Sequence, residues 1–215
     1  MKRIALCAAL LLALTSNAHA ALITAGSITA SAGGGLYATD GWADGSTVLS
    51  WTIDRTGSTY TYDYIFTVPK KEISHVILQV SESFTAANLL PGTTAGWALD
   101  YYSATAQGSS NPGMPASIKG LKWNTAGIST AWRIVTDRAP TDGNFYAKDG
   151  KDKSIDVYAY SGTSIGFTST VPVPDTLSGQ GSGENPVPLP PALLLMGSGL
   201  AALGAVRSAR KQPAT

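Results

Sequence analysis

The segment TYTYDYIFTV, residues 59–68, has the most regular alternation of side-chain types in the chain. In an extended strand its larger apolar and aromatic side chains share one face, and these are Tyr60, Tyr62, Tyr64, Phe66 and Val68. The opposite face carries Thr59, Thr61, Asp63 and Thr67. Successive side chains of a strand point to opposite sides, so this pattern predicts a strand with one buried and one solvent-facing side.

More strands are predicted on both sides of this segment. Leu49, Trp51 and Ile53 have the same period of two, and the sequence DRTGS at 54–58 favours a hairpin turn between the two strands. The other expected strands are 22–29, 73–80, 97–102, 118–123, 131–136, 154–160 and 164–168. Turns are expected at 111–113 and 142–144, and a short helix at 83–90. Many short strands with Gly, Ser and Asn between them predict an all-β fold, an antiparallel β-sandwich of jelly-roll or immunoglobulin-like type.

The composition narrows the classes of protein. The chain has 215 residues, of which 13% are charged, against about 25% in an average soluble domain. Its formal net charge of +1 gives no general attraction to nucleic acid. The single cysteine, Cys7, cannot form an internal disulfide, and with two histidines it cannot complete a Cys/His zinc cluster.

The first 20 residues have the order of a secretory signal peptide. Lys2 and Arg3 precede an apolar run at 4–14, and Ala18 and Ala20 supply the small residues of a cleavage site. The apolar run is too short to span a bilayer, which needs about 20 residues. We expect signal peptidase to cut after Ala20, which removes Cys7.

The other end of the chain has the composition of a linker followed by a membrane span. Residues 171–186 are rich in Pro, Gly and Ser, which is typical of a flexible linker. Residues 187–206 are mostly apolar and number 20, about the minimum for one transmembrane helix. The basic residues Arg207, Arg210 and Lys211 follow at once and favour a cytoplasmic location for this end, before a tail at 212–215.

Together these C-terminal features form a recognisable pattern. The short motif Val187, Pro188, Leu189 and Pro190, the glycine-containing apolar helix and the basic end resemble a PEP-CTERM sorting signal over 187–211. The eponymous form of that motif has Glu where Leu189 stands, and the Val-Pro-Leu-Pro variant also belongs to it. The segment 139–153 is similar to a recurrent stretch in exported proteins of the same class.

The resemblance implies a route and a setting. It implies a Gram-negative source, and recognition by an exosortase, an integral-membrane sorting enzyme similar to cysteine proteases. It also implies removal of the tail near the proline motif, and an association with exopolysaccharide and biofilm or floc formation.

Removal of both ends leaves an exported body at 21–170. The five basic residues at the two ends carry +5, whereas 10 Lys/Arg and 14 Asp/Glu between positions 21 and 186 give −4. This body has no cysteine, which suits an oxidising compartment, and one histidine, His75.

Few residues of the body suggest catalysis. His75 lies in an apolar strand, no Gly-x-Ser-x-Gly elbow is present, and only Glu72 and Glu82 precede the linker as glutamates. A secreted glycosidase or esterase is therefore the least favoured alternative, and we expect no enzyme activity.

Several aspartates stand in Asp-Gly steps, which are typical of turns. Asp40 with Asp44, and Asp149 with Asp152, place two carboxylates in one loop each, which raises the question of Ca2+. Neither loop has the EF-hand pattern, and lysines flank Asp152, so a solvated turn is preferred. We expect no metal and no cofactor.

Aromatic residues near turns suggest a second function. Trp42, Trp97 and Tyr101 lie near predicted turns, where their rings could stack on sugar faces. A carbohydrate-binding module is therefore the alternative. The main hypothesis is a non-catalytic exported protein that is transiently anchored in the inner membrane and then delivered to the cell surface or matrix. Its expected partners are signal peptidase, an exosortase and exopolysaccharide, and not nucleic acid.

Overall fold

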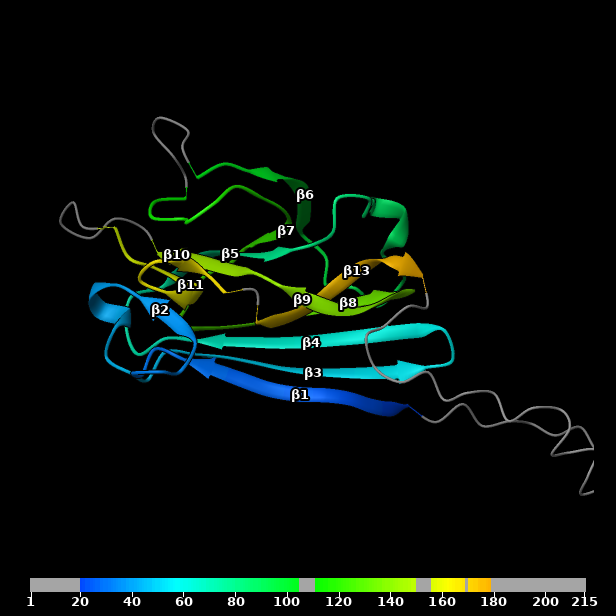
Figure 1. The fold of residues 1–215 in the computed structure, drawn as a ribbon, viewed down its shortest axis with the longest axis horizontal. Coiled ribbons are helices and arrows are strands. Elements are labelled where there is room, and N and C mark those ends of the chain that lie inside the picture. Colours follow the sequence, from blue (N-terminus) through cyan, green and yellow to red (C-terminus); the bar gives the residue numbers. More distant parts are fainter. Residues whose placement is uncertain (1–19, 105–110, 150–155, 169, 179–215) are drawn as a thin grey trace, which may run out of the picture. The chain divides into compact units, whose positions relative to one another are not determined.

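A computed structural model describes residues 20–104, 111–149, 156–168 and 170–178 (Figure 1). The regular elements of these ranges are β-strands and two single 3-10 turns. No helix within them is long and apolar enough to cross a membrane. The signal peptide expected before Ala20, the sorting signal expected at 187–211 and the tail at 212–215 lie outside the described residues.

The first sheet contains four antiparallel strands in the order β1-β3-β4-β8. They are β1 (Ala21–Thr29), β3 (Val48–Thr56), β4 (Thr59–Thr67) and β8 (Ser129–Thr136). The strands β3 and β4 form the expected hairpin, and Figure 1 shows them side by side with β1. Their pairing continues to Thr56 opposite Thr59, so the turn is shorter than the segment 54–58. Gly57 occupies this turn with φ of 62°, a conformation that glycine adopts without strain.

The second sheet has the strand order β12-β11-β10-β5-β7-β6, and β2 also pairs with β11. Its members are β2 (Leu36–Ala38), β5 (Ile73–Gln79), β6 (Trp97–Tyr102), β7 (Ile118–Asn124), β10 (Phe145–Asp149), β11 (Tyr158–Thr163) and β12 (Gly166–Phe167). A separate two-stranded sheet pairs β9 (Arg138–Gly143) with β13 (Val171–Ser178). All of these pairings are antiparallel.

The main core lies between the two large sheets. The aromatic face predicted for 59–68 points into it, and Phe66 of β4 meets Phe145 of β10 with ring centroids 5.0 Å apart. Two hydroxyls of the same face reach the small sheet, because Tyr62 donates to the carbonyl of Arg138 (2.7 Å) and Tyr64 to that of Pro172 (2.6 Å). The antiparallel β-sandwich expected from the sequence is therefore confirmed.

A second apolar cluster lies on the face of the second sheet that points away from the main core. It contains Ile77, Met114, Ile118, Tyr146 and Tyr160, all buried. Ile77 and Leu78 are neighbours in β5, and each belongs to a different cluster. The second sheet is thus apolar on both sides, which explains why β5 does not alternate between apolar and polar residues.

Most of the predicted strands are present, and Trp97–Tyr102 has the predicted bounds. The helix expected at 83–90 is wrong, since that segment forms only the 3-10 turn η2 (Ala86–Asn88). The turn expected at 142–144 is also wrong, because Asp142 and Gly143 end β9. The segment 139–153 supplies residues 139–143 of β9 and all of β10.

The linker expected at 171–186 is wrong for its first eight residues, and 179–186 lie outside the described residues. Residues 171–178 form β13, whose Val171 and Val173 are buried in the main core. In the described part of the chain, β13 pairs with β9 alone. Pro172 and Pro174 are tolerated because a proline, which has no N–H to donate, is compatible with an edge strand.

Candidate carbohydrate-facing surfaces

Trp42, the first expected stacking residue, is not on the surface. It ends the 3-10 turn η1 (Asp40–Trp42) and is 0% exposed, with its ring 5.6 Å from that of Phe66. Its indole N–H donates to the carbonyl of Lys70 (2.9 Å). A buried, hydrogen-bonded indole cannot stack on a sugar, so this expectation is wrong.

Trp97 and Tyr101 lie on one face of β6, but only Tyr101 offers an open ring. Trp97 is half-buried and packs against the main core, whereas Tyr101 is 62% exposed. The Tyr101 hydroxyl donates to the carboxylate of Glu82, which raises the pKa of that tyrosine. The ammonium of Lys119 lies 5.8 Å from the ring centroid.

A row of rings that the sequence analysis did not single out crosses the outer face of the second sheet. This tyrosine row consists of Tyr37, Tyr160, Tyr158 and Tyr146, from β2, β11 and β10. Neighbouring centroids lie 4.9, 6.3 and 6.4 Å apart in that order. Tyr37 and Tyr158 are half-buried, while Tyr146 and Tyr160 are buried. The alternation Tyr-Ala-Tyr at 158–160 was the sequence pattern that could have indicated it.

The row continues to His75, which is 3% exposed and lies 6.2 Å from Tyr146, centroid to centroid. Its Nε2 is hydrogen-bonded to Oδ1 of Asn111 (3.0 Å). Burial, aided by the charge of Lys122, lowers the pKa of His75 to about 3, so the imidazole is neutral at physiological pH. The partner of His75 is an amide, whereas a catalytic triad would need a serine on one side and a carboxylate on the other.

Two lysines flank His75 on the neighbouring strands. Lys148 of β10 stands directly opposite His75, and Lys122 of β7 stands opposite Ile77. Partial burial and the charge of Lys148 lower the pKa of Lys122, whose Nζ lies 5.8 Å from the Tyr102 ring centroid. Within the described ranges neither lysine forms an ion pair. This lysine pair therefore gives the tyrosine row a positive end.

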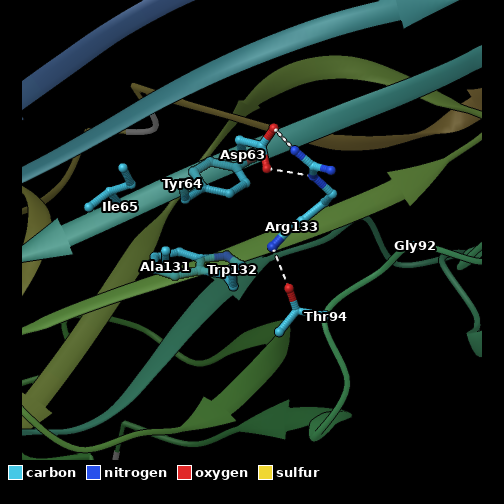
Figure 2. Close-up of a pocket in the computed structure, with 8 residues that line it drawn as sticks. All are labelled: Asp63, Tyr64, Ile65, Gly92, Thr94, Ala131, Trp132 and Arg133. Atoms are coloured by element: carbon cyan, nitrogen blue, oxygen red, sulfur yellow. Dashed lines mark hydrogen bonds and ion pairs between the residues drawn. The ribbon is translucent and has the colours of Figure 1, made fainter.

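A hollow of about 450 Å³ lies beside the edge of the first sheet, where a loop meets β4 and β8 (Figure 2). Eight residues line it, and they are Asp63, Tyr64, Ile65, Gly92, Thr94, Ala131, Trp132 and Arg133. Arg133 holds both oxygens of Asp63, at 2.7 Å from Nε and 2.8 Å from Nη2. The ion pair raises the pKa of Arg133. Asp63 is the one carboxylate among these eight residues, whereas glycoside hydrolysis needs two that face each other.

The carboxylates of the first Asp-Gly loop are taken by protein groups. Asp40 forms an ion pair with Lys71, and Asp44 accepts hydrogen bonds from the backbone N–H (2.9 Å) and the hydroxyl (2.7 Å) of Ser46. Both contacts lower the pKa of the aspartate concerned. No cluster of three or more potential metal ligands occurs among the residues that the structure describes. Asp152 of the second loop lies outside them.

Comparison of the chain with protein-family models, curated proteins and solved structures found no match.

Proposed function

We propose that the chain is an exported, non-catalytic protein of the cell surface or extracellular matrix, sorted through a PEP-CTERM-like tail and associated with exopolysaccharide. The observation that carries the proposal is the position of the folded body between the two terminal segments. Strand β1 begins at Ala21, the residue after the expected cut, and β13 ends at Ser178. Eight residues, 179–186, then separate the last strand from Val187.

Each terminal segment has a stated role in this proposal. Signal peptidase reads Ala18 and Ala20, and cuts without removing any part of β1. The composition of 179–186 predicts a flexible linker, and an exosortase acts at the motif Val187-Pro188-Leu189-Pro190 that follows it. The apolar run 191–206 acts as the transient anchor, and Arg207, Arg210 and Lys211 favour a cytoplasmic location for its end.

The sorting proposal is tested by the mass of the protein released from cells with and without an active exosortase. We expect a product that begins at Ala21 and lacks the basic end when the enzyme is active, and a product that retains it when the enzyme is absent. A double substitution, Pro188→Ala with Pro190→Ala, should give the retained form in active cells. The matched control is Pro172→Ala with Pro174→Ala, which alters two prolines of β13 and should leave tail removal intact. A tail that is retained in both strains would overturn the proposal.

A carbohydrate-binding module is the second candidate, and the tyrosine row with its lysine pair favours it. Half-buried Tyr37 and Tyr158 offer apolar ring surface on the face that also carries Lys148, directly opposite Tyr158, and Lys122. Neither ammonium group has an acidic partner in the described ranges. Aromatic rings pack against the apolar faces of sugars, and ammonium groups pair with carboxylates. The surface therefore fits a polysaccharide with acidic sugars. Tyr101 offers a separate exposed ring.

Affinity electrophoresis in gels that contain the producer's own polysaccharide tests this candidate. We expect retardation of the wild type, reduced by Tyr158→Ala and by Lys122→Gln with Lys148→Gln. Lys70→Gln is the control for lost charge, because Lys70 is exposed outside this surface. The mobilities of Tyr101→Ala and Trp97→Ala test separately whether the rings of β6 contribute to binding. Unaltered mobility in every gel would remove the candidate.

A secreted glycosidase or esterase has the least support. The hollow of Figure 2 offers one carboxylate, and the hydrogen-bond partner of His75 is Asn111.

A further inference from the structure

Strand β1 is the outermost strand of the first sheet, and its second edge has no partner in the described part of the chain. It pairs with β3 alone, and alternate residues of such a strand present N–H and C=O groups away from the sheet. Among the described residues, only its last one has a further backbone partner, since Thr29 donates to the carbonyl of Gly34 (2.8 Å). Within these ranges the edge is therefore open from Ala21 to Ile28.

The opposite edge of the same sheet is closed by a loop. The outward backbone groups of Arg133 in β8 bind Thr94, with Thr94 N–H donating to its carbonyl (2.9 Å) and Thr94 Oγ1 accepting from its N–H (2.9 Å). Val135 is bound in the same way by Leu90 N–H (2.8 Å) and Thr93 Oγ1 (3.0 Å). An approaching strand would find these groups already used.

The other edge strands carry different obstacles to pairing. In β6 the Asp100 carboxylate accepts from the N–H of Tyr101 (2.8 Å), and the Tyr102 hydroxyl donates to the carbonyl of Ala98 (2.9 Å). Strands β2 and β12 have three and two residues. Strands β9 and β13 contain proline and charged residues. Charges, prolines and short length are the usual protections of a sheet edge.

β1 lacks all three of these protections. Its sequence ALITAGSIT contains no charged side chain and no proline, and the first charged side chain after it is that of Asp40. Leu22 and Ile23 are 63% and 45% exposed. A bulge between Leu22 and Thr24 twists the start of the strand, but from Thr24 to Thr29 every residue is in regular register with β3.

We propose that two copies of this chain associate through β1, in antiparallel pairing about a two-fold axis near Gly26. This pairing joins the two four-stranded sheets into one sheet of eight strands, and each copy supplies the same edge. Because β1 has no charged side chains, pairing it with a second copy of itself brings no like-charged side chains opposite one another.

The protected edges also fix the size of the assembly. A filament would require β1 of one copy to add to a different edge of the next, and β8, β6, β9 and β13 are closed or carry charge or proline. The pairing is therefore isologous and stops at two copies. This inference does not depend on the sorting or binding proposals.

The test is sedimentation equilibrium of the chain as isolated from cells, over a concentration series, with the ends of the chain read by mass spectrometry. Those end masses report on processing, so failure to associate and failure to be sorted remain distinguishable. We expect a monomer–dimer equilibrium with no larger species. Ala25→Lys, at an exposed position in β1, should weaken the dimer at least about tenfold, because it places two ammonium groups at the pairing edge.

Thr52→Lys is the matched control. Thr52 is exposed and lies directly opposite Ala25, on the same face but in β3, which has a strand on both sides. It adds the same charge without touching the edge and should leave the association unchanged. Circular dichroism and thermal melting should show that both variants fold. A wild type that is monomeric up to its solubility limit, a filament, or equal weakening by both variants would overturn the proposal.

Discussion

His75 is a polar side chain that the fold keeps in its uncharged form. It is covered by Tyr146 and held by Asn111, with the ammonium groups of Lys122 and Lys148 on the flanking strands. Desolvation and both lysines disfavour a second proton, and the bond to Asn111 opposes them only in part. Protonation of His75 therefore favours the unfolded state over the folded one.

The first prediction concerns the pH dependence of stability. The pKa of His75 is about 3 in the folded chain and about 6.5 when unfolded, so only the unfolded state takes up the proton between these values. The resulting stabilisation is complete above about pH 6.5 and decreases by up to about 1.4 kcal/mol per pH unit as the pH falls toward 3. His75→Gln has no such proton, so its free energy of unfolding in urea should decrease less steeply below pH 6.5. Parallel profiles for the two proteins would contradict this.

The candidate site was predictable only in part, for reasons that operate at single residues. Trp42 follows an Asp-Gly step, which locally resembles an exposed turn, but its burial depends on Phe66 and on the carbonyl of Lys70. Those partners are distant in sequence. Tyr101 is exposed as expected, because it lies near the end of an edge strand. The tyrosine row joins three strands, and no single segment contains more than two of its rings.

Strand β13 shows how an element can lack a local signature. Its Pro and Asp residues favour a linker, yet its valines alternate into the core and its backbone pairs with β9 from Val171 opposite Gly143. Gly143 is needed there, since a Cβ atom at that position would lie 2.4 Å from Val173. The carbonyl of Pro172 also accepts the Tyr64 hydroxyl.

The second prediction is that the folded body ends after β13. A chain that stops at Thr170 loses two buried valines, at about 1.5–3 kcal/mol each, and leaves the outer groups of β9 unpaired. Urea denaturation should show a loss of about 3–6 kcal/mol relative to a chain that stops at Gln180. The second chain should match the stability of one that ends at Pro186. Equal stability of the Thr170 and Gln180 chains would contradict a structural role for β13.

Strands with strict alternation were predictable, and strands defined by a distant partner were not. The patterns of β3 and β4 follow from one buried and one solvated face, and both strands are confirmed. In β9, Pro140, Asp142 and Gly143 have low strand propensity, and the segment is extended because β13 pairs with it. A sequence read segment by segment has no access to that pairing.

At the scale of the whole molecule, the second sheet separates two apolar clusters and contributes side chains to both. Its inner face meets the first sheet, and its outer face is covered by Met114, Ile118 and the rings of Tyr146 and Tyr160. The hydroxyl of Tyr146 donates to the carbonyl of Pro112 (2.7 Å), and His75 holds Asn111, so the segment before β7 is fastened to this face. Strand β5 lies in the middle of this sheet, with Ile77 in the outer cluster and Leu78 in the main core.

The third prediction is that both clusters unfold in one transition. Ile77 and Leu78 are each 0% exposed, so replacing either with alanine should lower the free energy of unfolding by about 2–5 kcal/mol. Both side chains belong to β5, so the two clusters should unfold together. Unfolding curves from tryptophan fluorescence and from far-ultraviolet circular dichroism should therefore coincide in both variants. Ile65→Ala, at an exposed position of β4, is the control and should change stability far less. If Ile77→Ala instead produced a separate early transition, with Leu78→Ala still two-state, the outer cluster would be an independent unit and the sheet would not couple the two.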